Sequence, residues 1–189
     1  MKIGVDLDGV VFNSENYIAS YIELNFMKDI DDKKLDFCSA PTQNRYALNA
    51  NNFEAMMKVY EKSITKAPLM PYVKEALSYL KQNGHQLFAI TGLGRCGEKH
   101  IKLTKKRLKK EKIFFDGYFF SQVDKTEACK NVDLMIDDSY SVLTKLVEAG
   151  VKCFQFVSDR TQKVKGAESV YNWGEICRKI EMQKSQFEV

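Results

Sequence analysis

Short apolar runs alternate with helical patterns along the second half of this chain, and this alternation restricts the possible folds most. Each run is apolar along nearly its whole length, without a regular change between apolar and polar residues. Such strands are typical of a parallel sheet that helices cover on both faces. The pattern therefore predicts an α/β fold with a parallel sheet. The expected strands are Gln86–Thr91, Tyr118–Ser121, Val132–Ile136 and, as the last strand, Lys152–Val157; the expected helices are Glu98–Lys110, Thr126–Cys129, Ser139–Ala149 and Trp173–Met182.

The first part of the chain starts with one more strand and then departs from this order. A short apolar run, ended by an acidic turn, predicts the first strand. Two segments with apolar residues at helical spacing follow, separated by a polar and irregular stretch. Two prolines then mark a boundary before a further helix. The expected elements are the strand Lys2–Val5, the helices Ser14–Met27 and Phe53–Ile64, the boundary at Pro68 and Pro71, and the helix Val73–Gln82.

The helical segments interrupt the strand–helix order directly after the first strand, so we expect them to fold as a separate small unit. A chain of 189 residues suits one domain with such an insert, because domains usually contain about 100–200 residues. We predict a core domain formed by residues 1–13 and 71–189, and a helical cap formed by residues 14–70.

Composition excludes several classes of protein. No stretch approaches the roughly 18 consecutive apolar residues that a membrane span needs. Only Lys2 precedes the first apolar run, so we expect no signal peptide and a cytoplasmic location. The five cysteines are widely spaced without a Cys-x-x-Cys pair, and there are two histidines. A zinc cage is therefore not expected, and the thiols are expected to be free in a reducing compartment.

A basic run at Lys105–Lys112 carries much of the net charge of +4. It could attract nucleic acid or an anionic substrate. However, Ile101, Leu103, Leu108 and Ile113 supply an apolar stripe at helical spacing, which leaves the lysines on a solvated helix face. We favour the solvated face and expect neither a nucleic-acid partner nor a membrane partner.

Acidic and polar residues follow several predicted strands at the point where each strand ends. In open parallel sheets, ligands bind at the carboxyl ends of the strands. The sequence therefore predicts that acids and a lysine from segments far apart along the chain converge at one edge of the sheet. The segments are Asp6-Leu7-Asp8-Gly9, Thr91-Gly92, Lys125 and Asp137-Asp138.

These residue types fit phosphoryl-transfer chemistry. Magnesium takes about six oxygen ligands and keeps several waters, so the carboxylates of Asp6 and Asp137 with the backbone carbonyl of Asp8 suffice. With its charge offset by the metal and Lys125, Asp6 can stay ionised and attack phosphorus. The Asp8 carboxyl can protonate the leaving oxygen and later deprotonate a water.

The remaining residues of these segments have supporting roles in this prediction. The Thr91 hydroxyl and nearby backbone N–H groups can hold phosphoryl oxygens, and Gly92 allows close approach. Gly9 permits the tight turn that directs Asp8 inward. Asp138 supports the metal ligands from the adjacent position. Alternatively, Asp137-Asp138-Ser139 only caps the following helix, since Asp and Ser favour such positions.

The four segments resemble the motifs of the haloacid dehalogenase superfamily of phosphohydrolases, and the resemblance covers nearly the whole chain. It implies a Rossmann-like parallel sheet with a helical cap after the first strand. It further implies that Asp6 is the nucleophile, that Asp8 is the general acid/base, that Lys125 is the active-site lysine, and that Mg²⁺ is the cofactor. Lys130 lies close to Lys125 in the sequence and is the alternative for the lysine.

Within the superfamily, the chain is most similar to the small bacterial nucleotidase-like group that includes the deoxyribonucleotidases. This resemblance implies a phosphomonoesterase acting on a nucleoside monophosphate or a similar small phosphorylated metabolite. That group often has Thr-Ala-Arg after its second strand, whereas this chain has Thr91-Gly92-Leu93-Gly94-Arg95, which leaves the role of Arg95 open. The segments that carry the resemblance are Pro71–Leu77, Thr104–Leu108, Asp124–Lys130 and Val170–Ile176.

The cap should select the substrate, and Arg45 and Tyr46 are the candidate residues there. The arginine would bind a phosphate or carbonyl oxygen and the tyrosine would stack on a base; the alternative is a surface salt bridge and a core aromatic. A sugar phosphomutase, which also uses both aspartates, and a non-catalytic protein that binds a nucleotide or an anion are the competing functions. A dehalogenase is disfavoured because such enzymes lack the second aspartate. The sequence leaves a homodimer open.

Overall fold

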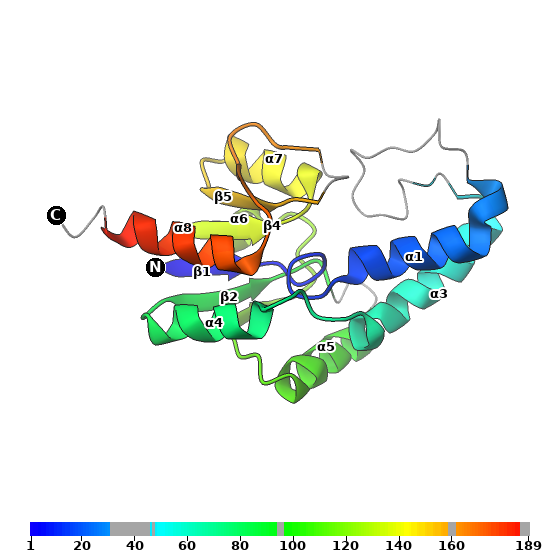
Figure 1. Ribbon diagram of the computed structural model, residues 1–189, viewed down its shortest axis with the longest axis horizontal. Helices are drawn as coiled ribbons and strands as arrows, with labels where there is room; N and C mark the ends of the chain where they lie inside the picture. Colours follow the sequence, from blue (N-terminus) through cyan, green and yellow to red (C-terminus); the bar gives the residue numbers. More distant parts are fainter. Residues whose placement is uncertain (31–45, 47, 94–96, 159–161, 186–189) are drawn as a thin grey trace.

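The computed structural model describes residues 1–30, 46, 48–93, 97–158 and 162–185. In this part of the chain, six strands form one sheet in the order β3-β2-β1-β4-β5-β6. Figure 1 shows β2, β1, β4 and β5 side by side in this sheet. Every neighbouring pair is parallel, so the predicted α/β fold with a Rossmann-like parallel sheet is confirmed. The strands are β1 Lys2–Val5, β2 Gln86–Ile90, β3 Gly117–Phe119, β4 Leu134–Asp137, β5 Cys153–Phe156 and β6 Glu168–Val170.

Strand β1 lies in the middle of the sheet, between β2 and β4. Its register aligns the carboxyl ends of both neighbours with its own carboxyl end. Ile3 pairs with Leu87 of β2 and with Leu134 of β4. Val5 pairs in the same way with Ala89 and Ile136, and these residues are fully buried. Residues that directly follow β1, and those at the ends of β2 and β4, therefore emerge at the same edge.

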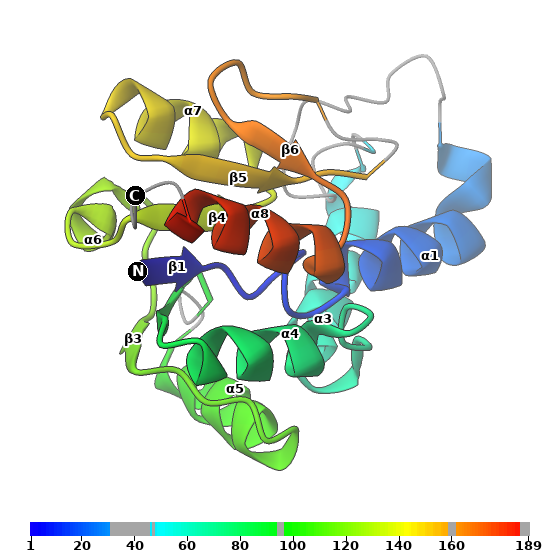
Figure 2. The same cartoon turned by 60° about the vertical axis from the view of Figure 1, so that its left-hand side comes forward.

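Helices cover both faces of the sheet (Figure 2). Helices α4 Val73–Gln82 and α8 Trp173–Ser185 pack against each other on one face, where Leu108 of α5 Glu98–Lys110 joins the same apolar cluster. Helices α6 Thr126–Cys129 and α7 Tyr140–Glu148 lie on the other face, and Cys129 and Leu143 belong to a second cluster there. Apolar burial on two faces explains why the central strands are apolar throughout.

The remaining helices form a unit beyond the carboxyl ends of the strands. Helix α1 Ser14–Phe26, a short 3-10 turn η1 Met27–Asp29 and helix α3 Ala50–Lys66 lie side by side there (Figure 1). They bury an apolar cluster of their own, which includes Ile18, Ile22 and Met56. This is where the sequence predicts a helical cap; its limits at residues 14 and 70 stay a prediction.

One strand and one helix start differ from those expected. The sequence predicts the last strand at Lys152–Val157, but β6 pairs with β5 beyond it, so that prediction is wrong. Of the three residues of β6, only Val170 is apolar and fully buried, so the strand lacks the apolar run that indicates the other strands. Helix α3 starts at Ala50, before the expected Phe53, because the Asn49 side chain accepts the N–H of Asn52 at 2.9 Å and caps the helix.

The lysines of the basic run on α5 face solvent, whereas Arg107 does not. Lys102, Lys105, Lys106, Lys109 and Lys110 are exposed, as the solvated-face prediction requires. Arg107 instead turns inward, and its Nη2 donates to the carbonyl of Ala67 at 2.6 Å. None of the helices in the described ranges is long and apolar enough to cross a membrane.

Candidate active site

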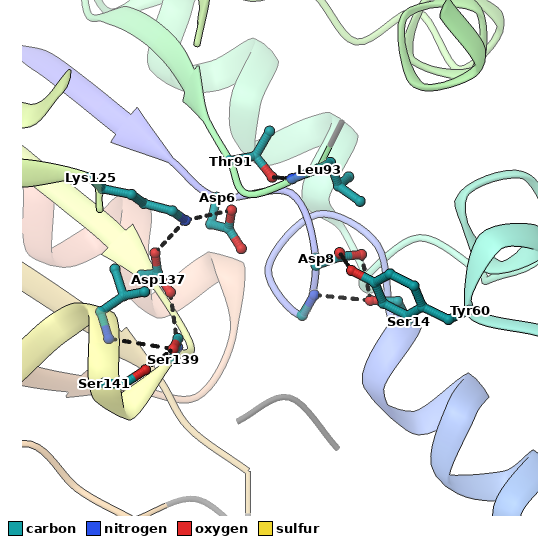
Figure 3. A network of polar contacts seen from close by, with 12 residues as sticks. Asp6, Asp8, Ser14, Tyr60, Thr91, Leu93, Lys125, Asp137, Ser139 and Ser141 are labelled. Atoms are coloured by element: carbon teal, nitrogen blue, oxygen red, sulfur yellow. Dashed lines mark hydrogen bonds and ion pairs between the residues drawn. The ribbon is translucent and has the colours of Figure 1, made fainter. Parts of the chain in front are cut away.

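Asp6, Lys125 and Asp137 meet at the carboxyl edge of the sheet (Figure 3). Asp6 directly follows β1, and Asp137 is the last residue of the neighbouring strand β4. The Lys125 Nζ donates to Asp6 Oδ1 and to Asp137 Oδ2, each at 2.7 Å. All three residues are buried. The predicted convergence of distant charged residues is thus present in the structure.

The geometry distinguishes between the two candidate lysines. Lys130 is exposed and pairs with Glu127 on the surface of the short helix, at 2.6 Å. Lys125 precedes that helix and is 4% exposed. Lys125 is therefore the lysine that the structure places beside Asp6.

Burial and mutual repulsion shape the titration of this group. Burial raises the pKa of Asp6 to about 7, with Asp137 and Asp8 adding to the shift and Lys125 opposing it. Burial acts to lower the pKa of Lys125, but the attraction of Asp137 and Asp6 outweighs it and raises the pKa above its ordinary value. Lys125 is therefore protonated at neutral pH and holds the two carboxylates together.

Asp138 brings a third carboxylate to the group. One ligand oxygen each from Asp6, Asp137 and Asp138 lies within 4.8 Å of the others. Burial, followed by repulsion from Asp137, Glu15 and Asp6, raises the pKa of Asp138 well above its ordinary value. Among the described residues, three carboxyl groups share one lysine here, and carboxylate oxygens are the ligands that Mg²⁺ prefers. The donor set fits such a cation, and the Asp138 carboxylate lies close enough to Asp6 and Asp137 to be a ligand beside them.

Gly9 makes the turn that the sequence predicted. Its φ of +71° lies in the left-handed region that favours glycine, and its N–H donates to the carbonyl of Phe12 at 2.9 Å. A Cβ at this position would overlap the Asp138 carboxylate. The glycine therefore permits both the turn and the close approach of Asp138.

Two residues that the sequence did not reveal hold the Asp8 carboxylate. Ser14 Oγ donates to Asp8 Oδ1 at 2.8 Å, and Tyr60 Oη donates to Asp8 Oδ2 at 2.8 Å (Figure 3). Ser14 is the first residue of α1, and this position six residues beyond Asp8 was the available signal. Tyr60 lies 52 residues away on α3, so no local pattern connects it to Asp8.

Thr91 and Gly92 follow β2 and line the same pocket as the acids. Thr91 is buried, and its Oγ1 accepts the N–H of Leu93 at 3.1 Å. Gln122 N donates to the Thr91 carbonyl at 2.9 Å, which joins the loop after β3 to the loop after β2. The pocket has a volume of about 220 Å³. Its other lining residues are Asp6, Asp8, Tyr60, Gln122, Val123, Lys125, Asp137, Asp138, Ser139, Ser141 and Val142.

The capping alternative for Asp137-Asp138-Ser139 is correct for part of the segment. Ser139 is the N-cap of α7, and its Oγ accepts the N–H of Val142 at 3.5 Å. Asp137 Oδ1 accepts the N–H of Ser139 at 2.9 Å while its other oxygen accepts from Lys125. The segment therefore both starts the helix and supplies carboxylates to the site.

The predicted stacking role of Tyr46 is wrong in this structure. Tyr46 is 5% exposed and belongs to the apolar cluster of α1 and α3. Its Oη donates to Glu23 Oε1 at 2.6 Å. Buried tyrosines pack their ring and pair their hydroxyl in this way, so Tyr46 is a core aromatic of the helical unit. Arg45 and Arg95 lie outside the described residues.

No protein-family model and no curated protein sequence matches this chain. Solved structures do match it over nearly its whole length. A haloacid dehalogenase-like hydrolase of Streptococcus pneumoniae is 17% identical, with a TM-score of 0.65 over 95% of this chain and 97% of its own. A magnesium-bound hydrolase of the same superfamily from Bacillus subtilis is 15% identical, with a TM-score of 0.60 over 94% and 96%.

A third match is a candidate beta-phosphoglucomutase of Thermotoga maritima, 17% identical, with a TM-score of 0.58 over 96% of this chain and 98% of its own. At these identities the likeness concerns the arrangement of the chain in space. The chain therefore has the Rossmann-like α/β fold of the haloacid dehalogenase-like hydrolases.

Proposed function

We propose that this protein is a magnesium-dependent phosphomonoesterase that works through an aspartyl phosphate on Asp6. The observation that carries the proposal is the contact of the Lys125 ammonium with both Asp6 and Asp137, at 2.7 Å each. Asp8, the second carboxyl group that phosphoryl transfer requires, lines the same pocket. A nucleophile, a charge-balancing cation and a proton donor are therefore adjacent.

The chain's own residues account for each bond change. Asp6 attacks phosphorus, so an oxygen–phosphorus bond forms as the ester bond breaks, and Asp8 gives its proton to the leaving oxygen. Asp8 then takes a proton from water as the water attacks the aspartyl phosphate, which releases phosphate and restores Asp6. Lys125 keeps Asp6 oriented, and Thr91 and Gly92 line the side of the pocket from which phosphoryl oxygens can be held.

Mg²⁺ would be held by the carboxylates of Asp6, Asp137 and Asp138 and by the predicted carbonyl ligand of Asp8. When bound, it supplies positive charge that offsets the charge on the phosphoryl oxygens. The grouping of ligand atoms within 4.8 Å supports this assignment, as does the magnesium in the Bacillus subtilis structure of the same fold.

For the substrate, we propose a small phosphorylated metabolite of the nucleoside monophosphate class, hydrolysed in the cytoplasm. The support is the sequence resemblance to the nucleotidase-like group at residues 71–77, 104–108, 124–130 and 170–176. A sugar phosphomutase is the second candidate, because it needs both aspartates and because the Thermotoga maritima neighbour is a candidate enzyme of that kind. Isomerised sugar phosphate without net release of phosphate would favour the mutase.

The test compares wild type with Asp6→Asn in a panel of nucleotides and sugar phosphates with magnesium. We expect phosphate release by wild type and a loss of at least about 100-fold in Asp6→Asn. Asp133→Asn is the matched control, because Asp133 accepts the N–H of Lys2 at the opposite end of the sheet. Equal rates in wild type and Asp6→Asn would contradict the proposed function.

A further inference from the structure

We propose that Tyr60 is a positioning residue that orients the Asp8 carboxyl group for proton transfer, an inference that rests on the proposed function of the same site. Tyr60 comes from helix α3, in the helical unit beyond the sheet, and its side chain reaches the pocket (Figure 3). Its Oη donates to Asp8 Oδ2 at 2.8 Å. Asp8 itself is attached to the end of β1, so this bond joins the helical unit to the reactive edge of the sheet.

Both oxygens of the Asp8 carboxyl group are held, from two different helices. Ser14 of α1 donates to Oδ1 while Tyr60 of α3 donates to Oδ2. The Ser14 hydroxyl is fixed in turn, because its Oγ accepts the N–H of Gly9 at 3.3 Å. With a donor on each oxygen, the plane of the carboxyl group is set.

Helix α3, which carries Tyr60, is held at its carboxyl-terminal end by contacts with the core domain. Ser63 Oγ, one turn further along α3, donates to the Tyr60 carbonyl at 2.6 Å, and Ser63 is fully buried. The Ser63 carbonyl accepts the N–H of Ala67 at 2.8 Å, and the Ala67 carbonyl accepts from Arg107 of α5. The end of α3 is therefore tied to a helix that packs on the sheet. This connection places the phenol at a defined position relative to Asp8.

Protonation by Asp8 accelerates hydrolysis most when the leaving alcohol or phenol is a poor leaving group. Phenyl phosphate and 4-nitrophenyl phosphate have similar shapes, but phenol needs protonation far more than 4-nitrophenol does. A residue that positions Asp8 should therefore affect hydrolysis of the phenyl ester more strongly. A residue that only stabilises the fold should affect both esters equally. The ratio of kcat/KM for the two esters separates these two roles, because kcat/KM reports the first half-reaction.

The first experiment measures this ratio in wild type, Tyr60→Phe and Tyr21→Phe with magnesium. Tyr21→Phe removes the same hydroxyl from α1, where the Tyr21 ring packs edge-on against Phe26. We expect the ratio of 4-nitrophenyl to phenyl phosphate to rise about tenfold in Tyr60→Phe, because general acid catalysis contributes about 10²–10⁴ and only part of it is lost. The ratio should stay within about twofold of wild type in Tyr21→Phe. An unchanged ratio in Tyr60→Phe overturns the inference.

The second experiment needs no turnover and no metal. It measures Tm for wild type, Tyr60→Phe, Asp8→Ala and the double variant in the presence of EDTA. Because the phenol contacts Asp8, we expect Tyr60→Phe to lower Tm by about 3 °C when it is introduced into the wild-type protein. Introduced into Asp8→Ala, the same substitution should lower Tm by less than about 1 °C. Equal decreases in both backgrounds overturn the inference. A wild type that hydrolyses neither ester overturns the proposed function, and the Tm comparison then decides the Tyr60–Asp8 interaction by itself.

Discussion

Lys125 lies 119 residues from Asp6 along the chain, yet its Nζ donates to the Asp6 carboxylate at 2.7 Å. The same ammonium contacts Asp137, and both carboxylates are almost completely buried. Removing one partner of a buried ion pair leaves uncompensated charge and costs about 3–5 kcal/mol. The pair is therefore both a catalytic arrangement in the proposed function and a determinant of stability.

Lys125→Met should lower phosphate release at least about 100-fold and the free energy of unfolding by about 3 kcal/mol in metal-free protein at about pH 8. Lys130→Met is the matched control, since Lys130 is 62% exposed and pairs with Glu127 on the surface. Its effect on unfolding should stay below about 0.5 kcal/mol. Urea unfolding and phosphate-release assays on both variants check this. A larger loss in Lys130→Met than in Lys125→Met would contradict the assignment of the lysine.

The metal-free protein should become less stable as pH rises from about 5 to about 8. Burial raises the pKa of Asp6 to about 7, whereas an unfolded chain has a value of about 3.9. Between these values the folded state binds more protons than the unfolded state, so the free energy of unfolding falls with increasing pH. We expect a decrease of about 2 kcal/mol, on the basis of roughly 1.4 kcal/mol per pKa unit and partial compensation by neighbouring charges.

Urea unfolding in EDTA at several pH values measures this slope, and Asp138→Asn should reduce it. Asp138 also has a raised pKa, so its removal takes away one group that must ionise in the folded state. The acids with lowered pKa values titrate below this pH range and leave the slope unaffected; they are Glu54, Asp116, Asp124 and Glu175. Magnesium should raise stability at the alkaline end of the range. Stability that increases with pH across this range in EDTA would contradict the prediction.

Gly9→Ala should destabilise the protein more than Gly84→Ala does. Both glycines have positive φ, +71° and +83°, so an alanine at either position costs about 1–2 kcal/mol of backbone strain. A Cβ at Gly9 would also overlap the Asp138 carboxylate, whereas nothing lies within 4 Å of a Cβ at Gly84. Overlap should add about 1–2 kcal/mol, and phosphate release should fall only in Gly9→Ala. Equal losses of stability in urea would show that Asp138 moves aside without cost.

The sequence predicts those parts of the site that depend on a local signal and on a general property of parallel sheets. Asp6, Asp8, Thr91 and Asp137 each follow or end an apolar run, and parallel strands bring their carboxyl ends to one edge. Their convergence therefore follows from the pattern of strands along the chain. Lys125 is different, because the sequence offers Lys130 as a close neighbour, and the two lysines are distinguished by their burial and by their partners in the structure.

The parts that the sequence does not reveal depend on how helices pack. Tyr60 reaches Asp8 because α3 packs beside α1 above the end of β1, and the spacing of apolar residues along α3 does not indicate that contact. The substrate role predicted for Tyr46 is wrong because the apolar cluster of the helical unit buries its ring. Strand β6 escapes detection because Val170 is the only apolar residue among its three, so it lacks the apolar run that indicates the other strands.

Arg107 gives the last prediction, because the basic run containing it does not distinguish it from its neighbours. Its Nη2 donates to the Ala67 carbonyl at 2.6 Å, and its guanidinium lies 5.1 Å from the centre of the Phe12 ring. Arg107→Met should lower the free energy of unfolding by about 2 kcal/mol, since hydrogen bonds from charged groups contribute about 1.5–3 kcal/mol. Lys106→Met, at an exposed position on the same helix, should change it by less than about 0.5 kcal/mol.

Arg107→Lys should restore only part of the loss, because an ammonium lacks the planar face that lies over Phe12. Urea unfolding of the three variants decides this, and equal stability of Arg107→Met and Lys106→Met would place Arg107 among the solvated cations of α5.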